Sequence, residues 1–489
     1  MPTRVYKLSL LGKHVEIKQI AKEHTINLAL DTIAKDKQAL VFVNTKRSAE
    51  KEAESISKKT NLSCEALAEK VRNVLPTPTK QCERLYRCVQ KGTAFHHAGL
   101  HSKQKTLVED GFRDGTIKII ACTPTLAAGL DLPAFRAIIR DLKRFDSFGM
   151  NFIPVLEYHQ MAGRAGRPKY DTFGEAICIA NSEDDAEHIV DEYINGEPEN
   201  ILSKLAVEPV LRTYVLSLIV TRIARTQEQL RDFFSKTFWA HQYEDHHEIE
   251  EIIERMVNLL EEIEQIKKGK TLEATRLGRR VAELYIDPLT AHKIRTELNT
   301  HMTDTGLLYL LCDCVEMKPL FGIRQAEYES LQQVALEEDV DDVFSEDYLP
   351  ALKTATVLKD WMDEKNEAVI LETKNITPGE LRNKIEKAKW LTYAAMEIAK
   401  ISGQRELSKR VYKTKLRLQN GVKEELLDLI RFKGIGRVRA RTLFNNGVKT
   451  AVDVKRTKFD MLNRLLGQAV ARDLKKQMGE NVVQSRLVK

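Results

Sequence analysis

The first 200 residues alternate short apolar runs with helical patterns, and this alternation restricts the possible fold more than any other feature. Four runs are predicted to be buried strands, at residues 39–44, 117–123, 135–141 and 174–180. Strands separated by helices form a parallel sheet that is covered on both faces. The loops at the carboxyl ends of such strands carry ligands. We therefore expect an α/β domain with its site on those loops.

The remainder of the chain is predicted to be almost entirely helical. Helical patterns at 209–222, 226–236 and 246–265 precede a basic turn between two short strand-like pieces, which predicts a winged helix. Residues 376–401 form the clearest long helix, with Thr377 as its N-cap and Gly403 just past its end. Residues 404–489 form a basic, all-helical end.

Composition excludes several classes of protein. With 43% hydrophobic and 30% charged residues, the chain of 489 residues is typical of soluble globular proteins. It contains no apolar run long enough to span a membrane and no signal peptide, so we predict a cytoplasmic location. Seven scattered cysteines form no CxxC pair, which predicts neither disulfides nor a metal site.

The positive charge is concentrated at the carboxyl end. The whole chain carries a net charge of +6, whereas residues 401–489 contain 22 Lys and Arg against 8 Asp and Glu, a net +14. A basic terminal domain on a near-neutral body indicates a contact with nucleic acid. A solvated, lysine-rich face is the alternative interpretation. The contact with nucleic acid predicts a cytoplasmic protein that is associated with the nucleoid.

The stretch HQMAGRAGRP at 159–168 places two arginines among small residues. On a helix, Gln160, Arg164 and Arg167 share one face. Guanidinium groups on such a face can present paired donors to a phosphate.

A second phosphate-binding candidate is ACTPTLAAGLDLPA at 121–134, where Thr123, Thr125 and Gly129 follow a strand. Backbone N–H groups can approach a phosphate here, and Asp131 can accept from a sugar hydroxyl. An ordinary loop is the alternative. In AFHHAGL at 94–100, the adjacent histidines are either a satisfied pair at a strand end, a phosphate contact or, least favoured, metal ligands.

The basic tail contains LLDLIRFKGIGRVRARTLFNNGV at 426–448. Gly434 and Gly436 form a tight hairpin between two helices and free the backbone to approach a phosphate. Positive charge is added by Arg437, Arg439 and Arg441. This helix–hairpin–helix pattern predicts DNA binding, and residues 465–477 are similar to a weaker second copy.

Taken together, the order and sequences of these motifs resemble those of the archaeal Holliday-junction-migration helicases of superfamily 2. The helicase region of DNA polymerase theta is a more distant relative. FVNTKRSAE looks like motif IV, FHHAGL like motif IVa, TPTLAAGLDLPA like motif V and HQMAGRAGRP like motif VI. LYIDPLTA at 284–291 is similar to the junction after the winged helix in that family. The resemblance implies a RecA-like α/β domain followed by winged-helix, helical ratchet and helix–hairpin–helix domains, at 1–203, 204–288, 289–403 and 404–489.

The resemblance also implies roles for individual residues. Gln160, Arg164 and Arg167 would face ATP and Mg²⁺ held mainly by another RecA-like domain, with both arginines acting as arginine fingers. Gly129 and Asp131 would lie near the nucleotide. Contacts to the DNA backbone would come from Thr45, Arg47, His97, Thr123 and Thr125.

Two further DNA contacts are expected from the family pattern. A hairpin within 141–158 would part the duplex with the apolar side chains Phe145, Phe148, Met150 and Phe152; an ordinary surface hairpin is the alternative. On the ratchet helix at 378–400, Trp390 would stack on a base. The family's arginine is expected at 383, where this chain has Asn383, so Arg382 or Lys387 is expected to replace it.

The family's first RecA-like domain is expected ahead of Met1. The sequence contains no GxxxxGK[ST], because Glu264 stands where the first glycine belongs before Gly269-Lys270-Thr271. DEYI at 191–194 is no DExH box. We therefore predict the C-terminal part of an ATP-dependent 3′–5′ DNA helicase acting on forked or junction DNA in replication-coupled repair and recombination, which hydrolyses no ATP alone. An ATP-independent DNA-binding module and an RNA helicase part are the alternatives.

Overall fold

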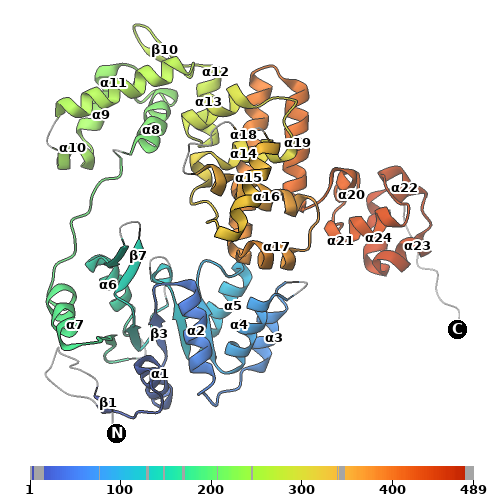
Figure 1. The fold of residues 1–489 in the computed structure, drawn as a ribbon. Helices are drawn as coiled ribbons and strands as arrows, with labels where there is room; N and C mark the ends of the chain where they lie inside the picture. The colour runs from blue at the N-terminus through green and yellow to red at the C-terminus, as the bar shows by residue number, and fades with distance from the viewer. Residues whose placement is uncertain are drawn as a thin grey trace, which may run out of the picture. The chain divides into compact units, whose positions relative to one another are not determined.

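A computed structural model describes residues 3–4, 16–75, 78–127, 132–146, 149–167, 171–205, 207–243, 246–338, 340 and 347–479. The chain divides into two compact units, shown in Figure 1. Unit 1 comprises residues 1–201 together with 377–380, and unit 2 comprises 202–376 and 381–489.

Unit 1 is built on a five-stranded parallel sheet, which confirms the predicted α/β fold. Its strands lie in the order β4-β5-β3-β6-β9. They are β3 (Ala39–Phe42), β4 (Thr93–His96), β5 (Ile119–Cys122), β6 (Arg136–Ile139) and β9 (Glu175–Cys178). All residues of β3, β4, β5 and β6 are buried, as expected for a sheet covered on both faces. Two two-stranded ribbons, β1 (Thr3–Arg4) with β2 (Glu16–Ile17) and β7 (Lys143–Asp146) with β8 (Gly149–Phe152), complete the described strands of this unit.

The helices of unit 1 cover this sheet. Helix α2 packs against β4 and β5, α4 packs against β4, and α1 and α6 pack along β6. The bounds are α1 (His24–Ala34), α2 (Lys46–Ser57), α3 (Glu65–Arg72), α4 (Lys80–Gln90), α5 (Ser102–Arg113), a 3-10 turn (Pro124–Leu126), α6 (Val155–Ala162), α7 (Glu183–His188) and a π-helix (Ile189–Ile194).

Arg136 of the sheet is buried, and its guanidinium has several hydrogen-bond and ion-pair partners. Arg136 in β6 donates to Glu175 (Nε–Oε2 2.7 Å), to Asp31 (Nη1–Oδ2 3.0 Å) and to the Thr32 hydroxyl (2.8 Å). Because a buried charge is stable only when it is paired and hydrogen-bonded, this network fastens α1 to β6 and β9.

Unit 2 begins with the predicted winged helix. The ribbon β10 (Ile266–Lys268) and β11 (Leu272–Ala274) follows three main helices and forms the wing. The helices are α8 (Glu208–Val220), α9 (Gln227–Ser235), a short α10 (Phe238–Tyr243) and α11 (His246–Glu262), and α12 (Arg276–Leu284) comes after the wing.

A helical bundle follows, and it shares one hydrophobic core with the winged helix. Its helices are α13 (Pro288–Glu297), α14 (Asp304–Cys312), α15 (Tyr328–Glu337), α16 (Tyr348–Met362), α17 (Glu367–Lys374), α18 (Pro378–Ile401) and α19 (Arg405–Asn420), with 3-10 turns at Val315–Met317 and Gln325–Glu327. The start of α18 confirms the predicted boundary: the Thr377 N–H donates to the Glu380 carboxylate at 2.8 Å, as in a capping box. Gly403 beyond its end has a φ of +80°, which favours glycine.

The carboxyl end of unit 2 has a small core of its own. It comprises a 3-10 turn (Glu424–Leu426), α20 (Leu427–Ile430), α21 (Arg437–Asn445), α22 (Ala451–Arg456), α23 (Phe459–Leu466) and α24 (Gln468–Gln477). In the described part of the chain, no helix is both long enough and apolar enough to cross a membrane. All seven cysteines are free.

The winged helix is joined to the bundle by a buried ion pair. Arg212 on α8 donates to both oxygens of Asp287, at 2.5 Å (Nε–Oδ1) and 2.6 Å (Nη2–Oδ2). Asp287 also caps α13, because its Oδ1 accepts from the Leu289 N–H at 3.0 Å. One carboxylate therefore fixes both the start of α13 and its attachment to α8.

Candidate functional site

Three of the predicted DNA-contact segments lie at the same edge of the sheet. Thr45 follows β3, His97 follows β4 and Thr123 follows β5, and the parallel register places the carboxyl ends of these strands together. The topology therefore brings together the segments that the sequence analysis assigned separately to motifs IV, IVa and V.

Thr45 and Arg47 open helix α2 at this edge. The Thr45 hydroxyl caps α2 by accepting from the Ser48 N–H at 3.0 Å, and its side chain is exposed. Arg47 is also exposed, and it forms no hydrogen bond or ion pair with the residues that the structure describes. Both side chains are accessible to a ligand.

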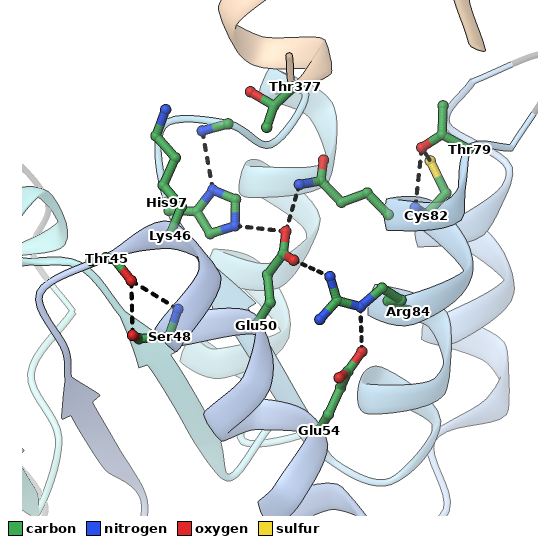
Figure 2. A network of polar contacts seen from close by, with 12 residues as sticks. Thr45, Lys46, Ser48, Glu50, Glu54, Thr79, Cys82, Arg84, His97 and Thr377 are labelled. Atoms are coloured by element: carbon green, nitrogen blue, oxygen red, sulfur yellow. Dashed lines mark hydrogen bonds and ion pairs between the residues drawn. The ribbon is translucent and has the colours of Figure 1, made fainter. Parts of the chain in front are cut away.

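A polar network behind this edge fixes the loop after β4 (Figure 2). At its centre, the buried Glu50 carboxylate of α2 pairs with Arg84 of α4 and accepts from the Gln81 amide at 2.7 Å. Burial alone would raise the pKa of Glu50, but hydrogen bonds from His97 and Gln81 together with the Arg84 charge hold this pKa below its ordinary value. The network therefore keeps a charged carboxylate inside the domain.

His97 belongs to this network and is fully buried. The Gly99 N–H donates to its Nδ1 at 3.1 Å, so its Nε2 carries the proton and faces Glu50 Oε1 at 3.3 Å. The imidazole thus shapes the loop and does not reach the surface. The DNA contact predicted for His97 stays a prediction, and the burial of its ring does not favour it.

Thr123 and Thr125 lie together at the end of β5. Their hydroxyl oxygens are 2.8 Å apart, with Thr123 buried and Thr125 exposed. Thr125 is therefore the member of the pair that is open to solvent, and Thr123 orients it.

The motif VI segment lies beside the start of β6. Ala165 forms a parallel bridge with Ala134, and the Ala134 N–H donates to the Arg164 carbonyl at 2.9 Å. Gln160 on the last turn of α6 is exposed. The half-buried Arg164 side chain donates to the Ala127 carbonyl of motif V. Motifs V and VI are therefore in direct contact through one of the two predicted arginine fingers.

The structure places Arg167 in an ion-pair network. Its guanidinium donates to Asp171 at 2.7 Å (Nε–Oδ2) and to Gln38 Oε1 at 2.7 Å, and Lys37 also pairs with Asp171 at 2.6 Å. The Arg167 guanidinium, with Lys37 as a second partner, lowers the pKa of Asp171 to about 2. Arg167 thus already has a carboxylate partner within the domain, in contrast to Arg164.

The predicted hairpin is present as β7 and β8. Asn44 ties its base to the end of β3 by donating to the Lys143 carbonyl at 2.7 Å. Met150 and Phe152 are both exposed, and the Phe152 ring lies 4.2 Å from the His188 ring and 4.3 Å from Lys143 Nζ. Phe148, together with Gly129 and Asp131 of motif V, lies outside the described residues.

On α18, Trp390 is anchored at one end of its ring. Its indole N–H donates to the Leu284 carbonyl at 2.9 Å, and the side chain is half-buried. Arg382 and Asn383 lie about two turns earlier on α18 and are exposed. Arg382 pairs with Glu386 at 2.7 Å. Lys387 donates to the Lys318 carbonyl at 2.7 Å, so Arg382 is the more accessible of the two expected substitutes.

The hairpin between α20 and α21 has the predicted form. Gly434 has a φ of +84°, Gly436 precedes α21, and a Cβ at either position would meet open space. Arg439 is exposed and donates to the Gly434 carbonyl at 2.7 Å. The backbone at Gly434 and Gly436 and the Arg439 guanidinium therefore remain available to a phosphate.

Arg437 and Arg441 of the same helix face the bundle. Arg441 forms a bidentate pair with Glu364, at 2.7 Å (Nε–Oε2) and 2.9 Å (Nη2–Oε1). Arg437 lies over the Trp361 ring at 5.2 Å, and its burial lowers its pKa. Of the three arginines that follow the hairpin, the structure leaves Arg439 the most open.

Three structurally important residues were not predicted. Asn44, Glu50 and Asp171 hold the hairpin, the loop after β4 and Arg167, respectively. A polar residue directly after a strand was a usable signal for Asn44. The other two carry no local pattern, because their partners are distant in sequence.

This fold and arrangement define the class of protein: a superfamily 2 helicase domain of the RecA type that carries motifs IV to VI, joined to a winged helix. Family models agree. The helicase conserved C-terminal domain matches residues 74–169, a helix-turn-helix domain matches 174–267, and archaeal helicase domain 4 matches 305–421.

Curated relatives identify the family. The chain is 39% identical to the ATP-dependent DNA helicase Hel308 of Methanocella arvoryzae, over 98% of this chain and 69% of the relative. Identity to the Hel308 proteins of Methanococcus vannielii and Pyrococcus abyssi is 36% and 37%, over 96% and 93% of this chain and 69% and 66% of the relatives. The chain belongs to the Hel308 family of archaeal helicases.

Proposed function

We propose that this chain is the DNA-tracking and arginine-finger part of an ATP-dependent 3′–5′ DNA helicase that unwinds forked or junction DNA. The observation that carries the proposal is the contact between the two motifs: Arg164 of motif VI donates to the Ala127 carbonyl of motif V. Motif V begins at Thr123 and Thr125, at the edge where the predicted DNA contacts lie. A change at Arg164 is thereby linked through one short segment to the DNA-contact edge.

The residues present fit a phosphate ligand. Arg164 is half-buried and has guanidinium donors beyond the one bound to Ala127, and Gln160 is exposed one turn before it. ATP with Mg²⁺, held mainly by a first RecA-like domain, would supply the phosphoryl transfer. The part of this chain is to place Arg164 where negative charge develops.

The structure also favours different roles for the two arginines. Arg167 is held by Asp171 and Gln38, so we assign it to positioning the motif VI segment. Arg164 is held by one neutral carbonyl. Breaking this hydrogen bond costs less free energy than breaking the ion pair between Arg167 and Asp171. We therefore assign the finger to Arg164.

Reconstitution tests this proposal. The chain is mixed with a separately produced first RecA-like domain of a Hel308 relative, and DNA-stimulated ATP hydrolysis is measured. We expect no hydrolysis by the chain alone, hydrolysis by the mixture, and a loss of about 100-fold or more in the Arg164→Ala variant. Arg113→Ala is the matched control, because Arg113 is an exposed arginine of the same unit that pairs with Asp110.

Equal turnover by the Arg164→Ala variant and the parent would remove the finger assignment. DNA binding that falls steeply with salt, ignores nucleotide and never supports hydrolysis would favour the alternative, an ATP-independent DNA-binding module. A preference for RNA over DNA in direct competition would contradict the assignment to DNA.

A further inference from the structure

A basic cavity lies within unit 2, and none of the residues that the sequence analysis assigned lines it. It has a volume of about 500 Å³ and is open to solvent between α12 and the carboxyl-terminal half of α18. Its polar lining consists of Arg276, Arg279, Arg280, Glu283, Glu397 and Lys400.

The walls of this cavity are held together by one arginine. Arg280 of α12 pairs with Glu283 at 2.7 Å and with Glu397 of α18 at 3.0 Å, and it donates to the Tyr393 hydroxyl at 2.9 Å. Both acidic side chains of the lining are therefore used by Arg280. The cavity is a fixed feature between two helices that are tied to each other.

The other three cations of the lining have no such partner. Arg276, Arg279 and Lys400 are exposed, and none of their side chains forms a hydrogen bond or ion pair within the described parts of the chain. Arg276 and Arg279 also lie in the first turn of α12, where the helix dipole disfavours positive charge. Residues that weaken a helix locally without a compensating contact are typical of binding sites. Three unpaired cations around one cavity therefore indicate a site for an anion.

The position of the cavity indicates which anion it binds. Trp390, Tyr393, Glu397 and Lys400 follow one another at helical spacing, so they share one face of α18. Trp390 contacts the end of α12 and Lys400 lines the cavity, about 15 Å farther along the helix. Arg280 of α12 covers Tyr393 and Glu397 between them, so a strand would run over the seam between α12 and α18 from Trp390 to the three cations.

We propose that this cavity binds the phosphodiester backbone of single-stranded DNA after the strand has passed Trp390. The inference rests on the proposed function, because it extends the path of the DNA along α18. Arg276 and Arg279 would bind phosphates from the α12 side and Lys400 from the α18 side. The contact is to the backbone, so it carries no sequence preference.

The test is binding of labelled oligo(dT) to the full chain by fluorescence anisotropy, across a range of salt concentrations. Arg276→Gln, Arg279→Gln and Lys400→Gln are combined in one variant. We expect its affinity at low salt to fall by about tenfold to 100-fold, and the slope of log K against log salt to decrease by about 2, because each phosphate contact contributes about 0.7. The charge-preserving variant, with Arg276→Lys, Arg279→Lys and Lys400→Arg, should bind nearly as the parent does.

The matched control removes three charges that already have partners. Arg231, Lys236 and Lys409 are exposed and pair with Glu250, Asp232 and Glu406, respectively. Their combined change to glutamine should leave both affinity and salt slope near the parent values. Equal losses in the control and the test variant would mean that net charge alone decides binding, which would overturn the site.

The remaining outcomes separate this inference from the proposed function. If the parent binds oligo(dT) and the test variant matches it in affinity and slope, only the cavity assignment fails. If inorganic phosphate or polyglutamate occupies the cavity at concentrations that leave oligo(dT) binding unchanged, the ligand is a free anion or an acidic protein, and the assignment also fails. If the parent does not bind oligo(dT) at all, the DNA-tracking role fails with it.

Discussion

The Arg212–Asp287 pair makes a sharp prediction about stability. Both side chains are nearly inaccessible, at 8% and 5% exposed, and the next carboxylate near Arg212, that of Glu208, is 4.0 Å away and 55% exposed. Asp287→Ala therefore leaves a buried guanidinium without its partner, which costs about 3–5 kcal/mol. The same change removes the cap of α13, which is worth about 1 kcal/mol alone.

The assay can be confined to unit 2. All three tryptophans of the chain, Trp239, Trp361 and Trp390, belong to unit 2, so denaturation followed by tryptophan fluorescence reports on that unit. We expect Asp287→Ala to lower its thermal midpoint by about 10 °C. Asp232→Ala, which breaks an exposed pair between Asp232 and Lys236, is the control and should change the midpoint little.

Two further variants separate the charge from the cap. Asp287→Asn keeps an oxygen that can cap α13 but loses the charge opposite Arg212, so we expect most of the destabilisation to remain. Replacing both partners, by Arg212→Met with Asp287→Leu, leaves no buried charge and should cost less than Asp287→Ala alone. An unfolding free energy of Asp287→Ala within about 1 kcal/mol of the parent would refute this reasoning.

Three other predictions follow from the same kind of contact. Asp171 should stabilise unit 1 above pH 4, where its carboxylate is charged in both the folded and the unfolded chain. This contribution should disappear as the pH falls from about 4 to about 2, the pKa that Arg167 imposes on Asp171. The stability difference between the parent and Asp171→Asn, followed by circular dichroism, should therefore shrink over that pH range, and a constant difference would contradict the prediction. Arg136→Met should destabilise unit 1 by about 3–5 kcal/mol in urea, since Asp31 and Glu175 lose a buried partner, whereas Arg113→Met should be neutral. Arg439→Ala and Gly436→Glu should weaken DNA binding without changing the melting profile, and Arg439→Ala should reduce the salt slope by about 1; DNA affinity equal to that of the parent in both variants would remove this hairpin from the DNA path.

The sequence was informative wherever a local pattern decides the structure. Apolar runs located β3, β5, β6 and β9, and the apolar periodicity with a cap and a glycine located α18 within a residue or two. β4 was recognised only through the histidines at its end. Its residues Thr93 and His96 are polar, and their partners, the Cys88 carbonyl and Glu109, become available only in the folded domain.

Residues whose environment depends on distant segments were beyond the reach of pattern analysis. Arg437, Arg439 and Arg441 look equivalent in the sequence, yet Glu364 lies opposite Arg441 from a position 77 residues earlier. The same holds for His97, whose burial depends on Glu50 and Gly99. The roles predicted for the site residues, and the four domain boundaries, stay predictions.

The parallel sheet of unit 1 has a mechanical consequence. Its strands are four residues long, so the edge that carries Thr45 and Thr123 and the edge beside Gln38 and Arg167 are about 13 Å apart. Buried, close-packed strands of this length are too stiff to absorb a displacement between their ends. A displacement of one edge is thus transmitted to the other. If the chain acts as proposed above, softening the sheet core should reduce the number of nucleotides advanced for each ATP hydrolysed.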